Sequence, residues 1–158
     1  MENVCIRRIN DADAPTVSKL ISRNFLEVNI KDYTRDEMEH LSEIYNTEKV
    51  LDISRNAHMY VACLDDTVVG CGAVSSFWGK QDKSSFLTIF VLPELHGKGI
   101  GRKIIETLEN DEYFLRAKSI EIPASITACE FYRRMGYDYK DSIKNLTDEG
   151  LYMMEKLR

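Results

Sequence analysis

The chain has 158 residues, of which 44% are hydrophobic and 30% are charged, and its formal net charge is -5 at pH 7. This composition fits one soluble globular domain over residues 1–158, and the negative charge disfavours general binding of nucleic acid. No apolar run reaches the roughly 20 residues that cross a bilayer, and the stretch MENVCIRRIN lacks the apolar core of a signal peptide. We therefore expect a cytoplasmic protein that binds no membrane.

The first half of the chain carries strand, helix and hairpin patterns in turn. Residues 5–9 alternate weakly and predict a strand, while residues 10–28 show the 3,4 apolar spacing of an amphipathic helix. The helical period returns over 35–45, and a further short helix is expected around 50–53. Two apolar runs, 59–64 and 68–75, flank a tight turn and predict an antiparallel hairpin.

The second half begins with a predicted loop at 77–85 and a long strand at 86–92, which the ring of Pro93 terminates. The remaining predicted elements are a helix at 99–108, a strand at 119–122, a helix at 127–135, and strands at 137–143 and 151–157. This order predicts an α/β layer with strands of mixed direction.

The stretch FVLPELHGKGIGRKII, residues 90–105, places three glycines on alternate positions between the long strand and a helix. A helix N-terminus has about four N–H groups without internal partners and a partial positive charge. Glycine lets an anion approach these groups, and Lys98, Arg102 and Lys103 add positive charge, so the pattern predicts a pyrophosphate site. The alternative is a tight strand-to-helix connection. The spacing fits neither the Walker loop nor the dinucleotide fingerprint.

Two motifs together resemble the GNAT superfamily of acyl-CoA-dependent N-acetyltransferases. The family loop [Gln/Arg]-x-x-Gly-x-[Gly/Ala] is matched by HGKGIG, residues 96–101. The second motif, Asn-x-x-Ala followed by Tyr and then Gly-[Phe/Tyr], is matched by Ser125, Ala128, Tyr132, Gly136 and Tyr137. The chain departs from the pattern at residue 96, where His replaces Gln or Arg, and at Ser125, where Asn is usual.

The resemblance extends over essentially the whole chain and implies the GNAT-like α/β (α+β) fold. That fold has a mixed, mostly antiparallel sheet of about six to seven strands flanked by helices. A splayed cleft is expected between the long fourth strand and the fifth.

The resemblance also implies acetyl-CoA as co-substrate and no metal. The end of the long strand would pair with the pantetheine arm, and the N–H at about Val91 would polarise the thioester carbonyl. The N–H groups of 96–102 would hold the pyrophosphate. The expected cofactor-binding residues are Phe90, Val91, Leu92, His96, Gly97, Lys98, Gly99, Ile100, Gly101, Arg102, Ser125, Ala128 and Tyr132.

Tyr132 occupies the position of the family's general acid, where a phenol with a pKa near 10 can protonate the leaving thiolate. The alternative is a tyrosine packed in the core. The base that deprotonates the amine is left open, because the long strand carries no acidic residue. Water relay is expected in preference to a single named base, and the candidate side chains are Glu121, Glu27, Asp32, Glu37, His58 and His96.

The expected function is N-acetyl transfer from acetyl-CoA to a primary amine of a small molecule or peptide. The alternative is a catalytically idle acyl-CoA-binding or regulatory module. Tyr33, Phe77 and Trp78 are candidates for the acceptor pocket, because exposed aromatic rings in loops need a reason. Cys5, Cys63, Cys71 and Cys129 show no CxxC spacing, so no metal site is expected. A homodimer is among the possible assemblies.

Overall fold

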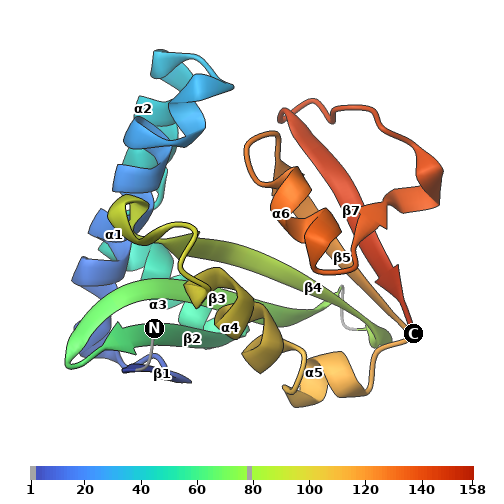
Figure 1. Cartoon of the computed structure of the whole chain (residues 1–158), viewed down its shortest axis with the longest axis horizontal. Coiled ribbons are helices and arrows are strands. Elements are labelled where there is room, and N and C mark those ends of the chain that lie inside the picture. Colours follow the sequence, from blue (N-terminus) through green and yellow to red (C-terminus); the bar gives the residue numbers. More distant parts are fainter. Residues whose placement is uncertain (1–2, 78–79) are drawn as a thin grey trace.

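The computed structural model describes residues 3–77 and 80–158, and within them one mixed sheet has the order β1-β2-β3-β4-β5-β7-β6 (Figure 1). Neighbouring strands are antiparallel except β4 and β5, which are parallel. The strands are β1 Val4–Arg8, β2 His58–Leu64, β3 Thr67–Phe77, β4 Lys80–Val91, β5 Ser119–Ser125, β6 Asp138–Tyr139 and β7 Leu151–Leu157. This seven-stranded sheet flanked by helices confirms the predicted fold class.

The helices cover the two faces of the sheet in separate groups. One core cluster packs the first three helices against β2 and β3, and a second cluster packs the later helices against β3, β4, β5 and β7. The helices are α1 Ala14–Glu27, α2 Arg35–Ile44, α3 Thr47–Asn56, α4 Ile100–Leu108, α5 Glu112–Leu115 and α6 Cys129–Arg134. Over the described residues, no helix has the length and hydropathy needed to cross a membrane.

The parallel pair β4 and β5 is joined only at one end. Lys83, Ser84 and Ser85 pair with residues 119–121, after which β4 follows β3 and β5 follows β7. Figure 1 shows the two strands diverging as a V, with α1 and α2 beside one arm and α6 beside the other. The predicted splay between the fourth and fifth strands is therefore confirmed.

A bulge lies in β4 where this strand borders the opening. Ala73 pairs with Leu87, whereas Cys71 pairs with Phe90, so β4 holds one extra residue between these pairs. Thr88 in the bulge has φ 57°. A β-branched residue with positive φ is strained, and such strain is found where a backbone is held in place for a purpose.

Two segments differ from the sequence-based prediction. The expected loop at 77–85 is mostly strand, because β3 runs to Phe77 and β4 begins at Lys80. Lys80, Gln81 and Asp82 are exposed in this ribbon, so no buried face marks it in the sequence. The expected strand at 137–143 is limited to Asp138–Tyr139, because a 3-10 turn with positive φ at Asp141 follows it.

Candidate active site

A cleft of about 900 Å³ lies between the arms of the V. Its walls come from α1, α2, β4, the glycine loop, the end of β5 and α6. Every cofactor-binding residue expected from the sequence lines this cleft except Leu92 and Lys98. Segments that are far apart in the chain therefore meet around one space.

The end of β4 presents one backbone unit to the cleft. The N–H of Leu92 donates to the carbonyl of Val69 at 2.8 Å, and Gly70 pairs with Val91 in the same register. Hydrogen-bonded and non-hydrogen-bonded pairs alternate in an antiparallel ladder. The N–H and C=O of Val91 therefore point away from β3 towards β5, whereas the N–H of Leu92 is already used within the sheet.

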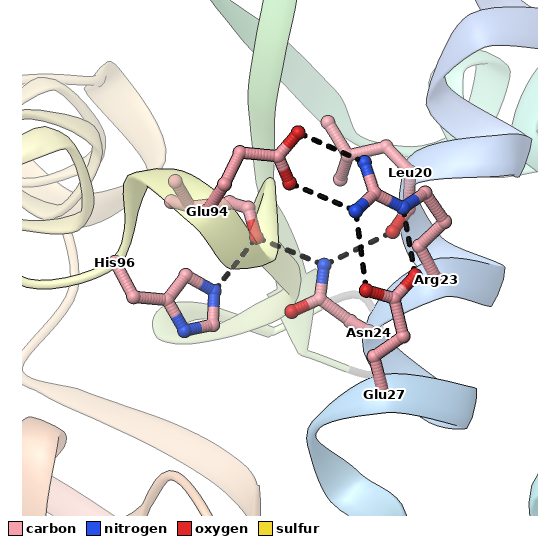
Figure 2. A network of polar contacts seen from close by, with 7 residues as sticks. Leu20, Arg23, Asn24, Glu27, Glu94 and His96 are labelled. Carbon is pink, nitrogen blue, oxygen red and sulfur yellow. Dashed lines mark hydrogen bonds and ion pairs between the residues drawn. The ribbon is translucent and has the colours of Figure 1, made fainter.

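Asn24 and His96 converge on the Val91 carbonyl from opposite sides (Figure 2). Nδ2 of Asn24 donates to this oxygen at 2.9 Å and also to the Leu20 carbonyl at 3.0 Å. Nε2 of His96 lies 2.8 Å from the same Val91 oxygen, so this ring nitrogen carries the proton. These bonds satisfy the carbonyl, and the Val91 N–H, which takes no part in the β3–β4 ladder, is directed into the cleft.

Asn24 was not identified from the sequence, although a signal exists. Its side chain is 3% exposed and lies on the buried face of α1, beside Ile21 and Phe25. A polar residue on an apolar helical stripe needs a hydrogen-bond partner, since burying an unpaired amide costs roughly 1–3 kcal/mol.

Arg23 ties α1 to the short 3-10 turn Pro93–Leu95 that precedes the glycine loop. Its guanidinium bonds Glu27 at 2.8 Å and Glu94 at 2.8 Å, and Figure 2 shows it lying between the two carboxylates. An exposed ion pair contributes little stability. The contact nonetheless orients the turn that leads from Val91 into the loop.

Gly97 and Gly99 are suited to an anion. Their φ angles are 76° and 87°, and a Cβ at either position would meet no atom within 4 Å. The first hydrogen bond of α4 runs from the Lys103 N–H to the Gly99 carbonyl, so the N–H groups of 100–102 precede the helical ladder. Open space, directed N–H groups and the positive helix end fit a diphosphate.

Gly101 has a different reason to be glycine. It has no positive φ, and an added Cβ would lie 3.0 Å from the ring of Phe131 on α6. The expectation that all three glycines clear room for an anion is therefore wrong for Gly101, because the space that a Cβ would occupy there is next to the Phe131 ring. Its missing Cβ admits an aromatic ring, while its N–H remains in the first turn of α4.

Tyr132 lies on the inner face of α6 with 6% of its surface exposed, and it lines the cleft. Its hydroxyl forms no hydrogen bond within the described residues, and because no buried side-chain oxygen there lacks a partner, this hydroxyl is open to the cleft. Burial raises the pKa of Tyr132, and the nearby Cys71 thiol raises it further. The phenol therefore stays protonated and can donate a hydrogen bond into the cleft.

The turn before α6 is held by Ser125 at the end of β5. The Ala128 N–H donates to the Ser125 carbonyl at 3.1 Å and lies 3.2 Å from its Oγ. Both residues line the cleft. The serine hydroxyl thus accepts a local bond and keeps its own proton available for a ligand.

The expected base candidates do not gather in one place. Glu121 is 3% exposed, bonds Nζ of Lys140 at 2.7 Å and does not line the cleft. His58 also lies elsewhere, with Nδ1 2.9 Å from Asp111. Glu37 lines the cleft, as does Glu149, which sequence reasoning did not select.

Two further candidates already have partners: Glu27 forms an ion pair with Arg23, and Asp32 accepts a hydrogen bond from Thr127. Of the aromatic residues expected in the acceptor pocket, Tyr33 lines the cleft. Trp78 lies outside the described residues. Within 3–77 and 80–158, no group of three or more His, Cys, Asp or Glu side chains could hold a metal ion.

Comparison with known proteins connects this geometry to a family. The pattern of the acetyltransferase (GNAT) domain matches residues 55–139, which is more than half of the chain. An N-acetyltransferase of Methanocaldococcus jannaschii is 34% identical over 96 residues, covering 58% of this chain and 59% of that relative. The chain thus matches less than two thirds of the relative's length.

Solved structures show the same fold over the whole chain. The PaiA N-acetyltransferase of Thermoplasma acidophilum, in complex with coenzyme A, has a TM-score of 0.82 at 20% identity and covers 98% of this chain and 99% of that one. A GCN5-related N-acetyltransferase of Rhodopseudomonas palustris has a TM-score of 0.82 at 20% identity, with coverage of 100% and 98%. The splayed sheet, the glycine loop and the matched domain pattern agree, and the chain belongs to the GNAT acetyltransferase family.

Proposed function

We propose that the chain is an acyltransferase that moves an acetyl group from acetyl-CoA to a primary amine of a small molecule or peptide by direct attack. The observation that carries this proposal is the hydroxyl of Tyr132, which lines the same cleft as the glycine loop, has no hydrogen-bond partner among the described residues and is open to the cleft. We also propose that residues 1–158 act as one domain. The near-complete coverage of the solved structures supports this.

The residues present fit acetyl-CoA, which supplies an activated acetyl thioester. Gly97 and Gly99 leave open space before the N–H groups at the start of α4, and Arg102 lines the cleft at the same turn. These groups favour a diphosphate. The Val91 N–H, directed by the bonds that Asn24 and His96 make to the neighbouring carbonyl, would bind the acyl oxygen as negative charge develops there.

Tyr132 would act on the leaving sulfur. Its raised pKa makes complete proton transfer to a thiolate less favourable than for a free phenol, whose pKa is near 10. The phenol therefore first stabilises the sulfur as a hydrogen-bond donor, and the proton follows as negative charge accumulates. Tyr132 is then a phenolate, and because its pKa is raised it takes a proton back from solvent, while the amine releases its own proton to solvent, so protons and charge balance over one turnover.

We propose that water relays the amine proton. Glu121 is bound to Lys140 outside the cleft. Glu37 and Glu149 line the cleft and are exposed, so each carboxylate can accept the proton through solvent. A relay of this kind needs no acidic residue on β4.

The test measures release of free thiol when the protein is mixed with acetyl-CoA and a panel of polyamines, amino acids, aminoglycosides and short peptides. Tyr132→Phe should lower kcat about 10²-fold or more and leave CoA affinity nearly unchanged. Tyr60→Phe is the matched control, because its hydroxyl bonds Asp111 outside the cleft. Equal loss of turnover and CoA affinity in Tyr132→Phe would make Tyr132 a packing residue. Tight CoA binding without thiol release for any amine would favour the idle binding module.

A further inference from the structure

Tyr33 joins three segments around the acceptor side of the cleft. Its hydroxyl donates to the Gly150 carbonyl at 2.6 Å and accepts from the Ile126 N–H at 2.9 Å. Residue 33 lies between α1 and α2, residue 126 between β5 and α6, and residue 150 directly before β7. One phenol therefore bonds two backbone groups on the opposite arm of the V.

A second contact lies beside the first. Oγ1 of Thr127 donates to Oδ2 of Asp32 at 2.7 Å, which doubles the connection between the same two segments. Gly150 has φ 77°, and a Cβ there would lie 3.1 Å from Cε1 of Tyr33. Glycine at this position thus allows the close approach of the tyrosine ring.

The backbone next to Tyr33 is fixed by the N-terminal cap of α2. Thr34 caps α2, and its N–H and Oγ1 contact Oε1 of Glu37 at 3.0 Å and 2.9 Å. This capping box begins at the residue after Tyr33. The ring therefore extends from a fixed helix end rather than from a free loop.

These contacts bound the cleft at its wide end. At the narrow end β4 meets β5 through the pairing of Ser85 with Glu121, and the arms then separate. Figure 1 shows the α1–α2 side and the α6 side facing each other across the V, and Tyr33 bonds across that space to Ile126 and Gly150.

We propose that Tyr33 is a specificity-determining residue that bridges the wide end of the cleft, so that the cleft admits a small free amine and excludes a polypeptide chain. This inference rests on the proposed acetyl transfer. A polypeptide that binds as an added strand pairs its main chain with exposed backbone groups of the host protein. At the wide end, the Ile126 N–H and the Gly150 C=O are already bound to Tyr33.

The charges on the cleft wall fit a small cationic amine. Glu37 and Glu149 line the cleft beside Tyr33. The bonds from Thr34 hold the pKa of Glu37 below its usual range, so this side chain is anionic at neutral pH. Tyr45 and Leu41 supply apolar surface for the carbon chain of the amine.

The kinetic test compares matched amines in free and peptide form. The free amines are 1,4-diaminobutane, spermidine and lysine, and the peptides carry the same lysine centrally or a free N-terminus. The wild type should prefer the free amines in kcat/KM, and Tyr33→Ala should raise the ratio of peptide to free amine about tenfold or more. Tyr33→Phe should raise it less, because the ring remains, and Tyr60→Phe should leave it unchanged.

A second measurement is independent of activity. Amide hydrogen exchange at Ile126 should be slow in the wild type and about tenfold or more faster in Tyr33→Phe, because the acceptor of this N–H is lost. The melting temperature and CoA affinity of each variant show whether the protein is folded.

The outcomes separate this inference from the proposed function. A wild type that acetylates the peptides better than the free amines, or a peptide ratio unchanged in a folded Tyr33→Ala, would overturn the role of Tyr33. If no amine at all releases thiol, the proposed function fails. Amide hydrogen exchange alone then tests whether Tyr33 bridges the cleft. Unchanged exchange of the Ile126 N–H in Tyr33→Phe refutes the bridging contact, and faster exchange supports it.

Discussion

The contact between Gly101 and Phe131 predicts a substitution whose effect on stability changes sign with its neighbour. Replacing a helical glycine by alanine usually stabilises a protein by about 0.5–1 kcal/mol, because glycine loses more backbone entropy on folding. In this structure the new Cβ would lie 3.0 Å from the Phe131 ring. Overpacking of this kind costs about 1–3 kcal/mol. Gly101→Ala should therefore lower the free energy of unfolding by about 0.5–2 kcal/mol.

Replacing the Phe131 ring by a leucine side chain should reverse the sign of this change in the free energy of unfolding. In a Phe131→Leu background the Cβ meets no ring, so Gly101→Ala should raise the free energy of unfolding by about 0.5–1 kcal/mol. The coupling energy between the two positions is then about 1–3 kcal/mol. Urea unfolding of the wild type, both single variants and the double variant measures it.

Gly99→Ala serves as the control for this cycle. Gly99 has φ 87° and open space around its Cβ position, so the cost is backbone strain of about 1–2 kcal/mol. That cost should be the same with phenylalanine or leucine at position 131. If Gly101→Ala instead has the same effect in both backgrounds, within about 0.5 kcal/mol, the packing explanation for this glycine is refuted.

Three other predictions follow from the buried polar groups. Burial opposes ionisation of Asp111, but bonds from Tyr60, the Tyr113 N–H and His58 lower its pKa below the ordinary 3.8. Asp111→Asn should therefore lower the free energy of unfolding by about 2 kcal/mol at pH 7. The difference in this free energy between wild type and variant should shrink as the pH falls below about 4, because Asp111 is then protonated. A difference that does not change with pH in urea titrations would contradict this. Lys140→Met should destabilise the protein by about 1–3 kcal/mol, because it leaves the Glu121 carboxylate buried without its partner, and the loss should be largely recovered in the double variant with Glu121→Leu. Because the pKa of Tyr132 is raised above 10, Tyr132 should stay protonated up to about pH 10 and cause no fall of kcat below that pH. A fall of kcat below about pH 10 that is present in the wild type and absent in Tyr132→Phe would contradict this.

The fold was predictable wherever one face of an element is buried. The amphipathic spacing of α1 and α4 and the apolar runs of β2 and β3 predicted these elements near their observed bounds. The sequence predicts a loop where the end of β3 and the start of β4 form a ribbon, because exposed polar residues carry no periodic signal. The strand predicted at 137–143 is too long, because positive φ at Asp141 depends on a tertiary turn, whereas the strand predicted at 151–157 matches β7.

The candidate site was predictable where chemistry depends on local sequence. Glycines before a helix and a tyrosine in a recurring motif predicted the loop and Tyr132, and both lie on the cleft. Asn24 interrupts the apolar stripe of α1, which signals a buried hydrogen bond, but its partner Val91 lies 67 residues away in the chain and no local pattern identifies it. Glu121 was a candidate base, yet its contact with Lys140 depends on how the chain folds after β6.

The sequence by itself predicted most of the helices and strands and a candidate anion-binding turn, because these follow from short-range patterns of glycine, charge and hydrophobicity, and the resemblance of its two motifs to the GNAT superfamily implied the family and the splayed sheet. Only the tertiary structure decided that Gly101 makes room for Phe131, that Asn24 and His96 hold the Val91 carbonyl, and that Tyr33 reaches Ile126 and Gly150. These contacts join residues that lie far apart along the chain or on neighbouring turns whose direction is set by packing. No local pattern encodes them, since each depends on where the partner element comes to rest.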